Sequence, residues 1–187
     1  MSKLKVLDGA PSEIVMERLF DAPRALVLRA MRESELIQRW SGGKRAIVTP
    51  AENDLKVGGR YRTAYRTHDG FEFAFTGAYR EVSDERVVHT ESMEGTPGES
   101  VITTTLTEAN GKTTMHLVMV FPDAATRDYV FGTGMAEGAD ESYDVLQALI
   151  ATLRGPLPRR VIASAITPRG SRRSPSRGRA RWCACPA

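Results

Sequence analysis

The amino-acid sequence predicts an α+β domain in which a curved antiparallel sheet of about seven strands wraps around one long C-terminal helix. The first observation behind this prediction is that polar and apolar residues alternate between Arg60 and Phe121, interrupted by short turn signals. The second is a single long helical pattern near the end of the chain, in which Met135, Ala139 and Leu146 share one face. The apolar face of the helix would cover the apolar face of the sheet.

The elements that precede this sheet are a strand and two short helices. The run over 12–20 alternates as a strand does, and it stops just before Pro23, a residue that fits the first turn of a helix. Short helices are expected over 23–31 and over 33–40, and the second of them carries Trp40 on its apolar side. These helices would bridge the first strand and the rest of the sheet.

Two dipeptides mark hairpins within the sheet. Asp69 with Gly70, and Asn110 with Gly111, are strong signals for tight turns between antiparallel strands. The remaining strands are expected over residues 45–50, 60–67, 71–80, 86–93, 100–107 and 113–121.

One face of the predicted sheet is rich in aromatic and thioether side chains. Successive residues of a strand point to opposite sides, so the arginines at 60, 62 and 66 should face water while the aromatic residues between them face inward. The inward residues expected from these strands are Tyr61, Thr63, Tyr65, Phe73, Phe75, Tyr79, Met119 and Phe121. The tyrosines are the stronger candidates for contact with a ligand, because a buried phenol needs a hydrogen-bond partner.

Composition divides the chain into three parts: a flexible N-terminus over 1–11, a folded domain over 12–154 and a disordered tail over 155–187. The tail contains eight arginines and no lysine or acid, so subtracting +8 from the net charge of +3 leaves −5 on the first 154 residues. The basic tail could attach to nucleic acid or to an anionic membrane, but we favour an extension that was read out of frame or appended, and we expect no nucleic-acid binding by the domain.

Cysteine usage and hydropathy indicate a cytoplasmic protein. Both cysteines, Cys183 and Cys185, lie in the tail, so we expect no disulfide framework in the domain. No secretory leader opens the sequence, and no apolar run reaches the roughly 18 residues that a membrane span requires.

Six segments in the expected order resemble one family. They are "FDAPRALVLRAM", "IQRW", "DLKVGGRYR", "DG" at Asp69, "GAYREVSDERVV" and "GMAEGADESYDVL". Together they resemble the bacterial homologues of the activator of heat-shock-protein ATPase, within the START-like (SRPBCC) superfamily. The resemblance covers about residues 12 to 154. It implies a helix-grip fold, similar to START and Bet v proteins, with a hydrophobic cavity between the sheet and the last helix.

The resemblance and the aromatic face together predict a binding site for a small hydrophobic or aromatic molecule, without a cofactor or metal. Its residues would be the inward set above together with Trp40, His89, Met135 and Ala139. An alternative is a co-chaperone-like interaction module, which would use the outward arginines Arg60, Arg62, Arg66 and Arg80.

The histidines leave a third alternative open. None of His68, His89 and His116 has a partner at metal-ligand spacing. If His89 and Glu91 faced inward, they would form an acid–base pair of the kind that a cyclase or dehydratase needs; otherwise they form an exposed pair. We assign no catalytic residue from the sequence and expect a binding protein more than an enzyme.

Overall fold

The described chain forms one curved antiparallel sheet with four helices. The computed structural model describes residues 3–49, 51–96 and 98–153. The strands are β1 (Lys5–Leu7), β2 (Glu13–Phe20), β3 (Ala46–Val48), β4 (Glu52–Asn53), β5 (Arg60–Thr67), β6 (Glu72–Val82), β7 (Arg86–Met93), β8 (Ser100–Ala109) and β9 (Lys112–Val120). The helices are α1 (Arg24–Arg32), α2 (Ser34–Trp40), α3 (Ala124–Gly132) and α4 (Met135–Leu153).

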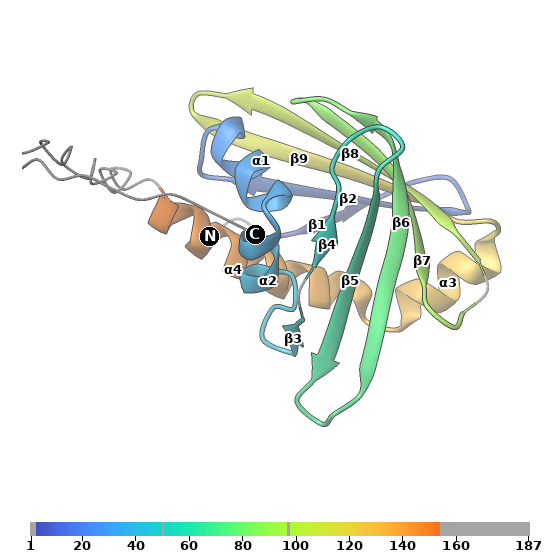
Figure 1. Cartoon of the computed structure of the whole chain (residues 1–187). Coiled ribbons are helices and arrows are strands. Elements are labelled where there is room, and N and C mark those ends of the chain that lie inside the picture. Colours follow the sequence, from blue (N-terminus) through green and yellow to red (C-terminus); the bar gives the residue numbers. More distant parts are fainter. Residues whose placement is uncertain (1–2, 50, 97, 154–187) are drawn as a thin grey trace, which may run out of the picture. The chain divides into compact units, whose positions relative to one another are not determined.

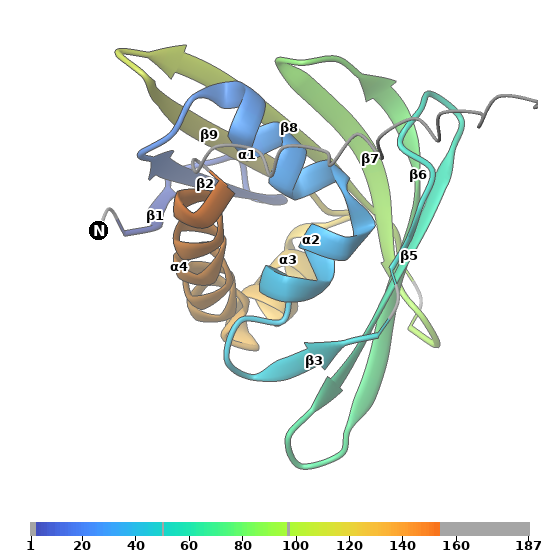
Figure 2. The ribbon, with the colours of Figure 1, turned by 60° about the vertical axis from the view of Figure 1, so that its left-hand side comes forward.

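The strands follow the order β1-β2-β9-β8-β7-β6-β5-β3, and β4 pairs separately with β5. Every pairing is antiparallel. The sheet curves around its helices, and α4 lies on its concave side (Figures 1 and 2). The expected α+β helix-grip fold is therefore confirmed.

Both predicted hairpin turns form, and each places a glycine at a positive φ. Asn110 and Gly111 have φ angles of 53° and 70°, as a tight turn between β8 and β9 requires at both central positions. Gly70, at the β5–β6 turn, has a φ of 90°. These turns fix the register of both hairpins and so decide which residues face inward.

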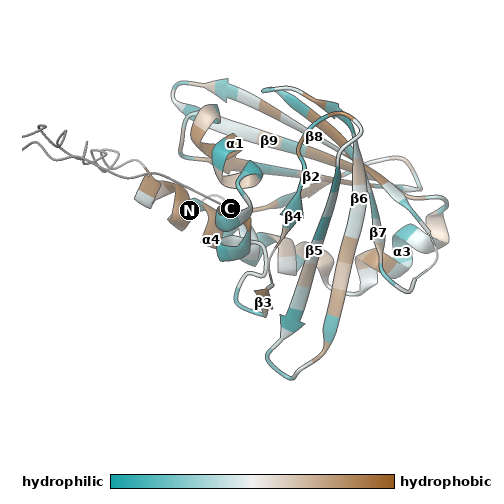
Figure 3. Ribbon diagram, viewed as in Figure 1, coloured by the Kyte–Doolittle hydropathy of each residue, from teal (hydrophilic) through white to brown (hydrophobic). Residues whose placement is uncertain are grey.

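The hydrophobic core lies on the side of the sheet formed by β2, β9 and β8. One buried cluster joins α1, α2 and α4 to this side through Phe20, Leu106 and Met115. A second cluster consists of Ile14, Met16, Ile102, Leu117, Met119 and Phe121. The alternation of hydrophobic and hydrophilic residues that produces this one-sided burial is visible along the strands in Figure 3.

A buried arginine joins β2 to α4. Arg18 is 1% exposed and lies on the inward side of its strand. Its guanidinium donates to Asp140, and its Nη2 lies 2.6 Å from Asp144 Oδ1. Lys3 Nζ lies 3.1 Å from both carboxylates. Because Asp140 and Asp144 are one helical turn apart, they present both carboxylates to the same cation.

Three elements were not expected from the sequence. β1 lies within residues 1–11, which were expected to form a flexible N-terminus, and it pairs with β2. β4 is a short strand that pairs with β5. α3 precedes α4, and Asp123 caps it by accepting a hydrogen bond of 2.7 Å from the Thr126 amide. The tail over 155–187 lies outside the described residues.

Candidate functional site

The inward face of β5, β6 and β7 is only partly covered. Its aromatic side chains are half-buried, whereas the inward residues of β8 and β9 are buried. Neither buried cluster includes these aromatic residues. They are Tyr61, Tyr65, Phe73, Phe75 and Tyr79. This half of the sheet therefore offers aromatic surface that the core does not use.

The aromatic residues form two groups along the strands. In the first, the rings of Tyr65 and Phe73 stack with centroids 5.0 Å apart, and Phe75 meets both edge-on. The Tyr65 hydroxyl lies 2.6 Å from Ser41 Oγ, in the loop after α2. In the second group, the Tyr61 ring lies 5.4 Å from the ring of His89 and 5.6 Å from that of Tyr79.

Gly77 makes room for Tyr61 on the sheet. The two residues are directly opposite each other in the β5–β6 pairing. A Cβ atom on Gly77 would lie 2.6 Å from the Tyr61 ring and 1.8 Å from the Thr90 carbonyl oxygen. Both distances are far inside van der Waals contact. Glycine at this position thus lets the Tyr61 ring cross the sheet surface towards β7.

The Tyr61 hydroxyl forms a hydrogen bond with a carboxyl group on the inward face of the sheet. The hydroxyl lies 3.2 Å from Glu91 Oε2 and 3.1 Å from the Thr90 carbonyl oxygen. Burial raises the pKa of Glu91 to about 7. When Glu91 is protonated, its hydroxyl donates to the Tyr61 oxygen, which then donates to Thr90. When Glu91 is ionised, Tyr61 donates its single proton to the carboxylate instead.

His89 lies beside the Tyr61–Glu91 pair, and its buried ring nitrogen, Nδ1, makes no hydrogen bond to the described protein groups. Burial lowers the pKa of His89 to about 4, so its imidazole is neutral at physiological pH. The alternation of β7 places Val87, His89 and Glu91 on the inward side, since His89 pairs with the buried Ile102. Of the two arrangements that the sequence left open for His89 and Glu91, the structure therefore has the inward one.

Tyr79 is held by a chain of hydrogen bonds that ends at α1. Its hydroxyl donates to Asn53 Oδ1 over 2.7 Å, and Asn53 Nδ2 donates to the Arg32 carbonyl oxygen over 2.8 Å. These bonds join β6, β4 and the end of α1. The three elements form the frame around an adjacent pocket.

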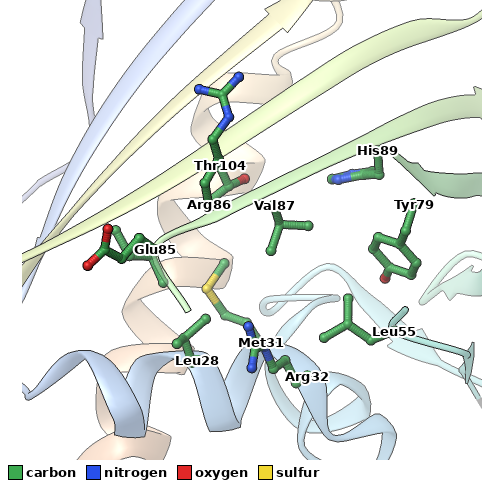
Figure 4. A pocket seen from close by; sticks show the side chains of 11 residues that line it. Leu28, Met31, Arg32, Leu55, Tyr79, Glu85, Arg86, Val87, His89 and Thr104 are labelled. Carbon is green, nitrogen blue, oxygen red and sulfur yellow. The ribbon is translucent and has the colours of Figure 1, made fainter. Parts of the chain in front are cut away.

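The pocket has a volume of about 100 Å³. Its walls come from α1, the loop over 54–59, and strands β6, β7 and β8, as Figure 4 shows from close by. The lining side chains are Leu28, Met31, Arg32, Leu55, Tyr79, Glu85, Arg86, Val87, His89, Thr104 and Leu106. Five of them are apolar (Leu28, Met31, Leu55, Val87 and Leu106), and His89 and Tyr79 stand at one end (Figure 4).

The charged groups at the pocket are matched by nearby partners. Arg32 Nη1 lies 3.1 Å from Asp84, and Arg32 Nη2 donates to the Ser83 carbonyl oxygen over 2.6 Å. Arg86 pairs with Glu81, and a separate ion pair joins Glu85 to Arg24. The Nε atom of Arg32 is nevertheless buried without a partner among the described groups.

The structure distributes the predicted binding residues over three environments. Tyr79 and His89 line the pocket. A second group lies on the same inward face of the sheet as Tyr79 but outside the pocket lining: Tyr61, Thr63, Tyr65, Phe73 and Phe75. The others, Trp40, Met119, Phe121, Met135 and Ala139, belong to the buried clusters or pack against them.

The pocket also contains residues that sequence reasoning did not select. Leu28 and Met31 come from the helical pattern of α1, which the sequence indicated only as a bridge. Leu55 lies in a loop, where no periodicity points to burial. Val87 precedes His89 by two positions on the same strand, and that spacing is a signal that could have found it.

The outward arginines are partly neutralised. Arg62 makes two hydrogen bonds to Glu94, of 2.8 and 2.9 Å, and Arg80 lies 3.3 Å from Glu99. Such exposed pairs contribute little to stability, but they reduce the local positive charge. The basic surface expected for a protein partner is therefore weaker than the sequence suggests.

A protein-family model matches residues 21–151, under the description "Activator of Hsp90 ATPase homolog 1-like protein". The chain belongs to this family. The match spans both short helices, the strands from β3 to β9 and nearly all of α4. Family membership agrees with the resemblance found in the sequence, and it supports a ligand-binding or co-chaperone-like module in general terms.

Solved structures of several bacterial proteins have the same fold. A Rhodobacter sphaeroides protein aligns with a TM-score of 0.76 and 21% identity, over 80% of this chain and 99% of that one. A Nitrosomonas europaea protein aligns with a TM-score of 0.71 and 20% identity, over 78% and 98% of the two chains. A Chromobacterium violaceum protein reaches 25% identity with a TM-score of 0.64, over 75% and 97%. No curated protein matches the chain.

Membrane-spanning helices and metal clusters are both absent from the part of the chain that the structure describes. Among the described helices, none combines the length and hydropathy needed to cross a bilayer. Over residues 3–49, 51–96 and 98–153, no three side chains of His, Cys, Asp or Glu gather as a metal site would require.

Proposed function

We propose that this protein binds a small hydrophobic or aromatic molecule between α1 and the β6–β8 part of the sheet. The observation that carries the proposal is the apolar pocket beside a half-buried aromatic face. Ligand sites are concave and mostly apolar, with a few placed polar groups. Here the polar groups are His89, Tyr79 and Thr104 together with the charged side chains of Arg32, Glu85 and Arg86.

The size of the pocket limits the ligand. A volume of about 100 Å³ is below the roughly 300 Å³ at which sites for drug-sized molecules begin. It is closer to the roughly 150 Å³ cavity that accommodates benzene. The proposed ligand is thus a single ring or a short chain, or one end of a larger molecule that continues along the half-buried aromatic face.

A pair of variants on β7 tests the proposal. Val87 lines the pocket, whereas its neighbour Val88 lies on the opposite side of the strand and is also half-buried. Val87→Phe fills the pocket with a larger side chain, and Val88→Phe adds the same atoms elsewhere. Calorimetric titration with toluene and indole should show binding to the wild type and to Val88→Phe, and loss of binding in Val87→Phe. Equal binding by all three proteins would contradict the proposal.

A second candidate function is acid–base catalysis on the bound molecule. It is favoured by the inward position of His89 and Glu91 and by the hydrogen bond between Tyr61 and Glu91. A neutral imidazole and a carboxyl group with a pKa of about 7 are both suited to proton transfer near neutral pH. Once a bound molecule is identified, its turnover by wild type and by His89→Ala decides between binding and catalysis: equal conversion rates would exclude a catalytic His89.

The co-chaperone-like alternative has weaker support in this structure. It requires a basic outward surface, yet Arg62 and Arg80 are each paired with a glutamate on that surface. We therefore place ligand binding first.

A further inference from the structure

Two residues that line the pocket each have a buried nitrogen that the protein itself does not satisfy. In the described part of the chain, the buried side-chain nitrogens without a hydrogen-bond partner are Arg18 Nε, Arg32 Nε and His89 Nδ1. Arg32 and His89 both line the pocket. They come from different walls, since Arg32 ends α1 and His89 belongs to β7 (Figure 4).

Such atoms are uncommon because an unpaired buried donor or acceptor is costly. The two tyrosines beside His89 have partners: Tyr79 donates to Asn53, and Tyr61 bonds to Glu91 and to the Thr90 carbonyl oxygen. Of the three unpaired nitrogens in the described residues, two therefore belong to residues that line the pocket, and the third, Arg18 Nε, belongs to the ion-pair cluster with Asp140 and Asp144. This is the pattern expected where a bound molecule supplies the missing partners.

The chemistry of each atom restricts that partner. Arg32 Nε is always a donor, and the guanidinium is held in place by Asp84 and the Ser83 carbonyl oxygen, so it requires an acceptor. His89 is a neutral imidazole, in which one nitrogen donates and the other accepts. A hydroxyl group can donate or accept, so it satisfies Nδ1 in either tautomer.

Between these atoms the walls are apolar, with Met31, Leu55 and Val87 among the lining side chains. Building on the ligand-binding function proposed above, we propose that the pocket selects a single-ring molecule with two oxygen functions. One is a hydroxyl bonded to His89 Nδ1, and the other accepts a hydrogen bond from Arg32 Nε. Dihydroxybenzenes are the simplest molecules of this class.

The charge balance favours a neutral ligand over a carboxylate. Three charged side chains line the pocket, and each has an oppositely charged partner: Asp84 for Arg32, Glu81 for Arg86 and Arg24 for Glu85. These pairs leave no uncompensated cation for an anion to neutralise. A phenolic oxygen can accept from Arg32 Nε without bringing a net charge into the pocket.

The test compares four single-ring probes of similar size that differ in the number and position of their hydroxyl groups: toluene, phenol, resorcinol and hydroquinone. Their affinities for the full chain are measured by calorimetric titration. Each hydrogen bond should increase affinity roughly 3- to 10-fold. We expect the better of the two dihydroxybenzenes to bind most tightly, followed by phenol and then toluene.

Variants assign each oxygen to its partner. His89→Phe keeps a ring beside Tyr61 and Tyr79 but removes both nitrogens, and His89→Asn restores a polar group near the position of Nδ1. Arg32→Lys keeps the charge but removes Nε. His89→Phe and Arg32→Lys should each reduce the advantage of the dihydroxybenzene over toluene roughly 3- to 10-fold, and His89→Asn should recover part of it.

Failure of this inference differs from failure of the proposed function. If toluene binds the wild type as tightly as resorcinol and hydroquinone, while Val87→Phe still abolishes binding, the oxygen selectivity is wrong and the binding function stands. Equal weakening of every probe by His89→Phe also overturns the selectivity. If none of the four probes binds the wild type, both proposals are contradicted.

Discussion

Replacing Glu91 with glutamine should change how stability depends on pH. Burial raises the pKa of Glu91 from 4.5 in water to about 7 in the folded protein. The folded protein therefore holds this proton more tightly than the unfolded chain does. The stabilising contribution is fully present below about pH 4.5 and is lost as pH rises through about 7.

The difference between these two pKa values, 4.5 and about 7, corresponds to about 3 kcal/mol, at about 1.4 kcal/mol for each pH unit. Glutamine preserves the shape and can still hydrogen-bond with Tyr61, but it has no carboxyl group to ionise. Relative to wild type, Glu91→Gln should thus gain about 3 kcal/mol in free energy of unfolding between about pH 4.5 and about pH 8.

Urea denaturation followed by far-ultraviolet circular dichroism at several pH values measures this difference. His89 contributes in the opposite direction, because its pKa falls from 6.5 to about 4 on folding and its contribution is lost as pH falls through this range. Since His89 is present in both proteins, the comparison isolates Glu91. Glu94→Gln, on the outward side of the sheet, serves as the control. A difference between Glu91→Gln and wild type that stays constant with pH would refute the buried, proton-binding role of Glu91.

Three further predictions concern the frame around the site. Gly77→Ala should lower the free energy of unfolding by about 2–3 kcal/mol, because its Cβ would lie 1.8 Å from the Thr90 carbonyl oxygen. Gly132→Ala is the control, since nothing lies within 4 Å of a Cβ at that position. Equal urea midpoints for the two variants would contradict the predicted clash. Replacing both acidic partners of Arg18, Asp140 and Asp144, with asparagine should lower the free energy of unfolding by about 3–5 kcal/mol, since it leaves a buried cation unpaired. Arg18→Met removes the cation itself and should lower the free energy of unfolding by less. If urea denaturation shows Arg18→Met to be the less stable variant, the result would be inconsistent with a buried charge. Combined reversal of Arg62 and Arg66 to glutamate should leave toluene affinity within about 2-fold of wild type, because both residues face away from the pocket; a larger loss in calorimetric titration would argue against this location of the site.

The sequence was sufficient for seven of the nine described strands, β2, β3 and β5 to β9, because alternation and turns are local signals. Tyr61, Phe75 and Met119 all face inward as their strand positions predict. His89 was harder, because both faces of 86–93 mix polar and apolar residues. Only the pairing of His89 with Ile102 decides its side, and that pairing depends on the register between β7 and β8.

The walls of the pocket depend on long-range packing that no local pattern contains. The long terminal helix was expected to form the wall opposite the sheet, but the lining residues outside the sheet strands and their turn come from α1 and from Leu55 in a loop. Residues of α4 such as Ala139 pack into the core instead. Arg18 shares the inward side of β2 with Met16 and Phe20, so its burial could have been inferred from alternation, but its acidic partners are more than a hundred residues away.

The central claim is that the full chain binds a small molecule in the pocket beside His89. Native mass spectrometry of the purified wild type and of Val87→Phe, followed by denaturation and identification of any released molecule, tests it most directly. The account predicts a discrete added mass on the wild type that is absent from Val87→Phe, and the released molecule should be a small ring that carries oxygen. An added mass retained by Val87→Phe, or a wild type that stays free of ligand even after incubation with toluene, resorcinol and hydroquinone, would contradict it.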